Sequence, residues 1–82
     1  MSPDDTPYTP KQGQYLVFIY YYAKLHGRPP SERDMQQYFR VSPSAVHNMV
    51  LSLEARGLIQ RTPGGARSIC LLVSREKLPD LE

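Results

Sequence analysis

Residues 31–67 read SERDMQQYFRVSPSAVHNMVLSLEARGLIQRTPGGAR, and the first part of this stretch predicts a short helix. Ser31 suits its start, because the hydroxyl can accept hydrogen bonds from the free backbone N–H groups of a first turn. Acidic residues follow, where they oppose the positive end of the helix dipole. Met35, Tyr38 and Phe39 then fall at i, i+3 and i+4, the spacing of one apolar stripe on a helix of about two turns.

A second helix is predicted directly after a turn at residues 40–41. Ser42 caps it, and Pro43 suits the first helical position, where its missing N–H would have had no partner. This helix should reach Arg56, with Gly57 taking the left-handed conformation that closes it. Its apolar stripe has the spacing i, i+3, i+4 and i+7 and consists of Val46, Met49, Val50 and Leu53.

A small β-hairpin should follow the second helix. Residues 58–61 and 68–73 are β-prone runs on either side of 62–66, where Gly64 and Gly65 favour a turn. A helix, a tight turn, a second helix and a hairpin in this order are typical of a nucleic-acid-binding unit, here called the reading head (31–67). We therefore expect a fold that is mainly α with a small β-hairpin, a three-helix winged helix-turn-helix.

The remaining predicted helix precedes this stretch and is the first along the chain. Thr9 can cap it, Pro10 fits its first position, and Gln12 stands where a capping box places Glu or Gln. It should run to about His26, with Gly27 closing it and two prolines beyond. The predicted division of the chain is a flexible N-terminal tail over 1–8, the winged domain over 9–73 and a C-terminal tail over 74–82.

Composition limits the possible classes of protein. The chain has 82 residues, enough for one small domain, and 40% of them are hydrophobic. It lacks both an apolar run of about 18 residues and the layout of a signal peptide, and Cys70 is its single cysteine, so we expect a cytoplasmic protein with no membrane partner. The net charge is +2, but residues 24–67 hold seven Lys or Arg against three Asp or Glu, which concentrates positive charge on the predicted reading head.

The side of helix 43–56 opposite its apolar stripe is the candidate base-reading surface. A helix in the major groove reads base edges mostly from its N-terminal half. Asparagine there can pair with adenine through two hydrogen bonds, and alanine can meet a thymine methyl group. The alternative is a polar face that is simply solvated. The candidate base-reading residues are Ser42, Ser44, Ala45, His47 and Asn48.

Contacts to the DNA backbone are expected from the wing and from the first helix of the reading head. Arg61 and Arg67 flank a glycine-bearing tip, so the two cations can straddle a phosphate backbone or enter a narrow minor groove. The alternative is a surface hairpin with ordinary solubilising arginines. The full candidate set is Ser31, Arg33, Arg40, Arg61, Gly64, Gly65 and Arg67.

Within helix 10–26, residues 15–23 are apolar or aromatic on all sides, which is unusual for a surface helix. Its expected inward set is Tyr15, Phe18, Ile19, Tyr22 and Ala23. Val17, Tyr20 and Tyr21 are then left on the side expected to face water. Either the tails fold over this side through Leu78 and Leu81, or it is a homodimer or partner contact. Stacking of exposed tyrosines on single-stranded bases is a third use.

Residues that would support catalysis or metal binding do not form recognisable patterns. His26, His47 and Cys70 lack metal-ligand spacing, and Gly64-Gly65 is not followed by the lysine and helix of a phosphate-binding loop. The serines are caps or strand residues without an evident His and acid partner. We expect neither an enzyme nor a bound cofactor or metal.

Several motifs resemble the N-terminal DNA-binding domain of LexA-type SOS repressors. The motifs are 8–12 (YTPKQ), 27–31 (GRPPS), 42–46 (SPSAV), 55–59 (ARGLI) and 64–71 (GGARSICL). The resemblance covers 8–72 and implies a three-helix winged domain that binds duplex DNA as a dimer on palindromic half-sites. It also implies base contacts at the five residues named above.

The chain departs from that family pattern in three respects. LexA-type repressors have a C-terminal autoprotease domain, and this chain ends where its hinge would begin, so we expect no self-cleavage and no dimerisation through that domain. The loop before helix 43–56 is one residue shorter. His47 and Asn48 stand where familiar repressors tend to have acidic residues, which argues against the usual operator. Winged-helix repressors of the MarR and PadR kind share the architecture.

The main hypothesis is therefore a small transcriptional regulator that binds a specific duplex DNA sequence. Helix 43–56 would read the major groove, and the wing 58–73 would contact the backbone or minor groove. The rival hypothesis is a winged-helix protein-interaction module that docks a partner through the aromatic face of helix 10–26 and Leu51. A further alternative is that the chain is the head of a longer repressor.

Overall fold

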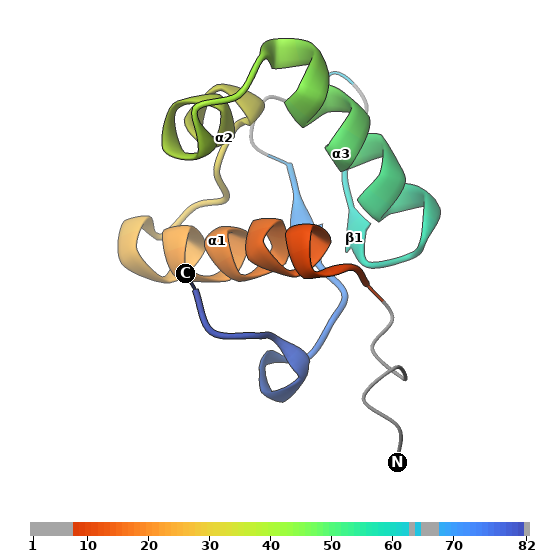
Figure 1. Cartoon of the computed structure of the whole chain (residues 1–82). Coiled ribbons are helices and arrows are strands. Elements are labelled where there is room, and N and C mark those ends of the chain that lie inside the picture. The colour runs from red at the N-terminus through yellow and green to blue at the C-terminus, as the bar shows by residue number, and fades with distance from the viewer. Residues whose placement is uncertain (1–7, 63, 65–67, 82) are drawn as a thin grey trace.

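The structure, a computed structural model, describes residues 8–62, 64 and 68–81 (Figure 1). Most of the predicted N-terminal tail, residues 1–7, lies outside this description. Figure 1 shows α1 between the α2–α3 pair on one side and the C-terminal segment on the other. The elements are α1 (Pro10–His26), α2 (Glu32–Phe39), α3 (Pro43–Ala55), β1 (Ile59–Gln60), β2 (Cys70–Leu71) and the 3₁₀ turn η2 (Arg75–Lys77).

All three helices begin where the capping residues predict. Thr9 accepts from the Gln12 N–H at 3.1 Å, and the Gln12 side chain accepts from the Thr9 N–H at 2.9 Å. Ser31 and Asp34 form the same reciprocal pair, at 3.2 and 2.8 Å. Ser42 caps α3 by accepting, at 3.2 Å, from the N–H three residues later. The predicted helix starts are therefore confirmed.

The helix ends agree with prediction to within one residue, and one of them is strained. Gly27 and Gly57 have φ of 71° and 73°, the left-handed conformation expected of them. The last residue of α3 is Ala55, one before the expected end. Arg40 closes α2 with φ 56° and ψ 51°, which makes it the one non-glycine residue with positive φ in the described part of the chain. Arg40 thus makes the turn between α2 and α3 in a left-handed conformation that is unfavourable for a residue with a Cβ atom.

The core lies where the three helices and the hairpin meet. The predicted stripe of α3 is confirmed for Val46, Val50 and Leu53, each with 0% exposure, while Met49 is half-buried against the same core. The other fully enclosed side chains come from α1, α2, the hairpin and, at Pro30, the loop between α1 and α2. They include Tyr15, Leu16, Ile19, Met35 and Ile59.

The hairpin forms in the predicted place but its strands are shorter than predicted. Ile59 pairs with Leu71 and Gln60 with Cys70, so each strand has two residues. Beyond Gln60, the Thr62 N–H donates to the Ser68 hydroxyl at 2.9 Å, and that hydroxyl donates to the Thr62 carbonyl at 3.1 Å. Beyond Gln60, the Ser68 side chain therefore replaces backbone hydrogen bonding between the two strands.

The outer side of α1 corrects one sequence-based expectation. Val17, expected to face water, is 2% exposed, and Leu16, left out of the inward set, is fully buried. Tyr22 and Ala23, expected inward, are half-buried. The physical reason is that α1 is covered from two sides, so a single-stripe projection underestimates how much of it is buried.

The covering segment is residues 74–81, for which the sequence indicated no firm structure. It contains the η2 turn, and Leu78 packs against the core. The Tyr8 hydroxyl donates to the Lys77 carbonyl, and the Gln14 amide donates to the Asp80 carbonyl at 3.0 Å. A C-terminal segment therefore folds over part of α1 through Leu78, and a dimer or partner contact at the rest of this face stays a prediction.

Candidate nucleic-acid interface

The predicted base-reading residues lie together on the outer side of the N-terminal half of α3. Ser42 caps the helix, and its hydroxyl lies 3.3 Å from that of Ser44. The opposite side of the helix is sealed in the core. The exposed members of the set are Ser42, Ser44, Ala45, His47 and Asn48. Their exposure confirms the projection of the helix, while their contact with bases stays a prediction.

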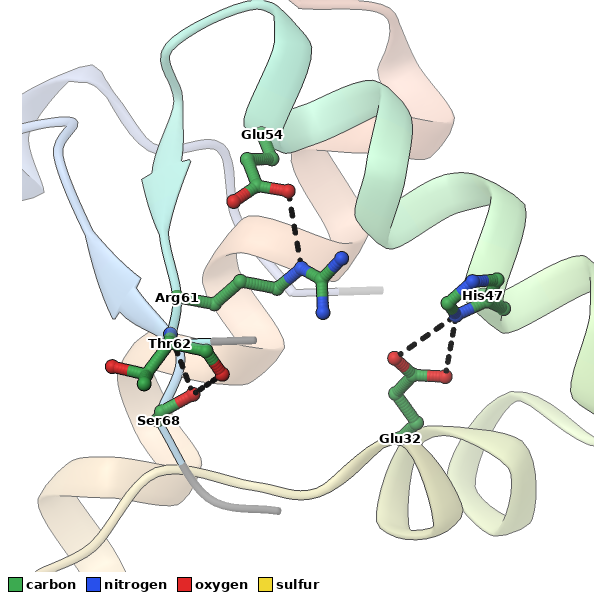
Figure 2. Close-up of polar contacts among 6 residues, drawn as sticks. All are labelled: Glu32, His47, Glu54, Arg61, Thr62 and Ser68. Atoms are coloured by element: carbon green, nitrogen blue, oxygen red, sulfur yellow. Dashed lines mark hydrogen bonds and ion pairs between the residues drawn. The ribbon is translucent and has the colours of Figure 1, made fainter. Parts of the chain in front are cut away.

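A contact between α2 and α3 involves one of these residues and was missed by sequence reasoning. The Nδ1 atom of His47 lies 3.3 Å from each carboxylate oxygen of Glu32, as Figure 2 shows. The sequence indicated Glu32 only as an acid of the first helical turn. The two residues are 15 positions apart, so no helical spacing links them. Only the packing of α2 against α3 brings them together.

The predicted wing cation Arg61 also has an intramolecular partner. Its Nε donates to a Glu54 carboxylate oxygen at 3.1 Å, which ties the wing to the end of α3 (Figure 2). The Arg61 side chain is 20% exposed, so it is not a fully solvated arginine, and its contact with DNA stays a prediction. Gly64 is exposed with a positive φ of 81°. Gly65 and Arg67 lie outside the described residues.

The predicted phosphate contacts in the first part of the reading head differ in accessibility. Arg33 and Arg40 are exposed. Ser31 is half-buried, and its hydroxyl already accepts from the Asp34 N–H. Its O–H can still donate to another group. The structure thus presents two accessible arginines beside α3 and one serine that also holds the helix start.

The aromatic face predicted for a dimer or partner is reduced by the C-terminal segment. Val17 is buried, and Tyr20 is half-buried with the Arg75 guanidinium 5.8 Å from its ring centroid. Tyr21 stays 39% exposed, and Leu25, on the same side one turn later, is 79% exposed. The accessible part of this face is therefore the end of α1 rather than its middle.

The part of the chain that the structure describes has neither a metal-binding cluster nor a membrane-spanning helix. No three His, Cys, Asp or Glu side chains there converge in a way that would hold a metal ion. Among the same residues, no helix has the length and apolar character needed to cross a membrane.

An exposed polar face on α3, α2 packed across its start and a hairpin behind it define a winged helix-turn-helix domain. In this class of domain, the second helix of the helix-turn-helix motif, which corresponds to α3, lies in a DNA groove. The family model described as the LexA DNA binding domain matches residues 5–68, and the chain therefore belongs to this family.

Three curated relatives agree with this assignment. The LexA repressor of Thermosipho melanesiensis is 39% identical over 70 residues, covering 85% of this chain and 35% of the relative. The LexA repressor of Thermosipho africanus is 41% identical over 64 residues, covering 78% and 32%. The LexA repressor of Geobacter metallireducens is 37% identical over 65 residues, again covering 78% and 32%. The chain thus spans about a third of the length of these relatives.

Proposed function

We propose that this chain binds a specific duplex DNA sequence and acts as a transcriptional repressor. The observation that carries the proposal is the two-sidedness of α3, whose apolar side is sealed in the core while its N-terminal half presents short polar groups to solvent. Membership of the LexA DNA-binding-domain family supports it. Helix α3 would lie in the major groove.

Each residue of the exposed face has a role that its chemistry suits. Asn48 would pair with adenine through its amide, and Ala45 would contact a thymine methyl. Ser42 and Ser44 would bond bases or the nearest phosphate, because free N–H groups at a helix start also attract phosphate oxygens. His47 would accept from or donate to a base edge according to which ring nitrogen carries a proton.

Phosphate contacts would position this face without reading sequence. Arg33 and Arg40 are exposed beside it, and Ser31 retains a free hydroxyl donor. Arg61 uses its Nε for Glu54, and its Nη atoms are further donors. Gly64, together with Gly65 and Arg67, would bring the wing close to the backbone or the minor groove.

A homodimer would let two copies read a palindromic site. The exposed end of α1, with Tyr21 and Leu25, is the surface that we propose for this contact. Exposed aromatic and aliphatic side chains that lie together favour association. Sedimentation of the chain with and without Tyr21→Ser would test the surface, and an unchanged monomer–dimer equilibrium would argue against it.

Selection of binding sites from a random duplex pool tests the main proposal. We expect a palindromic consensus, and an affinity that falls with log salt at a slope of about 0.9 per released phosphate counterion. Asn48→Ala should relax the preference at about one base position, at a cost of about 1–3 kcal/mol there. Arg33→Ala is the control at an exposed cation of α2, and it should weaken binding to all sequences alike.

Two results would contradict the proposal. If Asn48→Ala left the selected site unchanged, α3 would not present the reading face that we assign to it. If micromolar protein did not shift any duplex at low salt, the DNA-binding function itself would fail. A stable complex with another protein in the same preparation would then favour a protein-interaction module.

A further inference from the structure

The contact between Glu32 and His47 connects a residue outside the proposed reading face with one inside it. The carboxylate at the first position of α2 faces the imidazole on α3 (Figure 2). Both carboxylate oxygens lie 3.3 Å from Nδ1, and the His47 side chain remains 51% exposed. The other ring nitrogen, Nε2, does not take part in this contact and is therefore available for a ligand.

The chemistry of the two groups decides which nitrogen carries the proton. A glutamate carboxylate at neutral pH has no proton to donate and can only accept. The His47 Nδ1 atom must therefore be the donor in this contact. A neutral imidazole has one N–H, so Nε2 is then left with a lone pair and can only accept.

We propose that Glu32 is a positioning residue that determines base specificity by holding His47 as a hydrogen-bond acceptor. This inference rests on the proposed DNA-binding function. An acceptor on the reading face selects bases that present an exocyclic amino group in the major groove, namely adenine N6 or cytosine N4. It disfavours guanine, whose major-groove edge presents two acceptors.

Stability alone does not account for this contact. An exposed hydrogen bond of this kind contributes little to folding, because water competes for both groups and two side chains lose freedom. The helix dipole favours an acid at the start of α2, but it does not direct the side chain toward His47. In addition, a carboxylate beside a phosphate-binding face opposes binding to DNA. Control of the His47 tautomer gives this acid a role in spite of that repulsion.

The tautomer can be measured without DNA. In the full chain labelled with ¹⁵N-histidine, the two ring nitrogens of His47 should show at pH 8 that Nδ1 is protonated and Nε2 is not. In Glu32→Ala this preference should be lost, because either nitrogen can then carry the proton. His26, whose ring centroid lies 4.2 Å from that of Tyr22 in a tilted arrangement, is an internal control whose signals should not change. Glu32→Gln keeps the side-chain length and should also populate both tautomers, since an amide can accept or donate.

The effect on base preference needs a double-mutant cycle. Sites selected by the unaltered chain should show adenine or cytosine at one position that His47→Ala no longer discriminates. Glu32→Ala should reduce that preference about fivefold, the worth of roughly one hydrogen bond to a base. In the His47→Ala background, Glu32→Ala should not alter any base preference. Glu76→Ala removes an equal charge from η2, away from α3, and should leave the preference intact.

The outcomes separate this inference from the function on which it rests. A His47 ring protonated at Nε2 in the unaltered chain, or a tautomer unaffected by loss of Glu32, would overturn the inference. So would binding in which Glu32→Ala selects the same base as before. Failure of the unaltered chain to bind any duplex would instead overturn the proposed function, whatever the ¹⁵N spectra show.

Discussion

Replacing Arg40 with glycine is expected to stabilise the fold while weakening DNA binding. Arg40 has φ 56° and ψ 51°, a left-handed conformation that costs a residue with a Cβ about 1–2 kcal/mol. Glycine relieves this strain but adds roughly 0.5–1 kcal/mol of backbone entropy to the unfolded chain. The difference predicts a net gain of about 0.5–1 kcal/mol in the free energy of unfolding. For a domain of this size, that is a rise of about 2–8 °C in melting temperature.

Two control variants isolate the backbone contribution. Arg40→Ala removes the same charge and side chain but keeps the left-handed strain. Gly57→Ala is the mirror experiment, because Gly57 has φ 73° and nothing lies within 4 Å of a Cβ placed there. It introduces the strain without a steric clash and should lower the free energy of unfolding by about 1 kcal/mol.

Urea titration followed by far-UV circular dichroism measures these differences in the free energy of unfolding. The comparison requires that the dependence of this free energy on urea concentration is the same in all variants. The reasoning is refuted if Arg40→Gly is no more stable than Arg40→Ala, because the strain would then be absent. DNA binding provides the second measurement. If Arg40 contacts a phosphate, both Arg40 variants should reduce the slope of log affinity against log salt by about 0.9. Stability and affinity would then change in opposite directions for the glycine variant.

Leu53→Ala, at a position with 0% exposure, should lower the free energy of unfolding by about 2–5 kcal/mol in the same titration, and a negligible loss would mean that α3 is not anchored by its stripe. Ser31→Ala removes the hydroxyl that accepts from the Asp34 N–H and should cost about 1 kcal/mol; an unchanged midpoint would show that this cap does not stabilise α2. Burial raises the pKa of the Tyr15 phenol above 10.0, and burial also raises the pKa of Tyr8, so folding favours the neutral phenols. Their contribution to stability is fully present below pH 10 and is lost as pH rises through the folded-state pKa values. Tyr15→Phe should make the loss of stability at alkaline pH smaller. Equal stability of the unaltered chain at pH 9 and pH 12 would contradict this coupling between folding and phenol ionisation.

Local features of the chain could be predicted because their partners are close in sequence. The cap pairs of Thr9 with Gln12 and of Ser31 with Asp34 are each three residues apart, so the sequence shows both members at once. The stripe of α3 follows from its period alone, and the resemblance of the motifs indicated the family. These features were sufficient for the order of the elements and for the outward face of α3.

What the amino-acid sequence by itself determined is therefore where each helix starts and stops and which side of α3 is apolar. Tertiary structure alone decided which polar groups meet on the candidate interface, because Glu32 and His47 belong to different helices and the wing residue Arg61 reaches back to Glu54. It also decided that Val17 is buried, since the segment that covers α1 lies more than 50 residues away along the chain. The physical reason is that caps and stripes depend on the backbone of one helix, whereas these contacts depend on how separate elements pack.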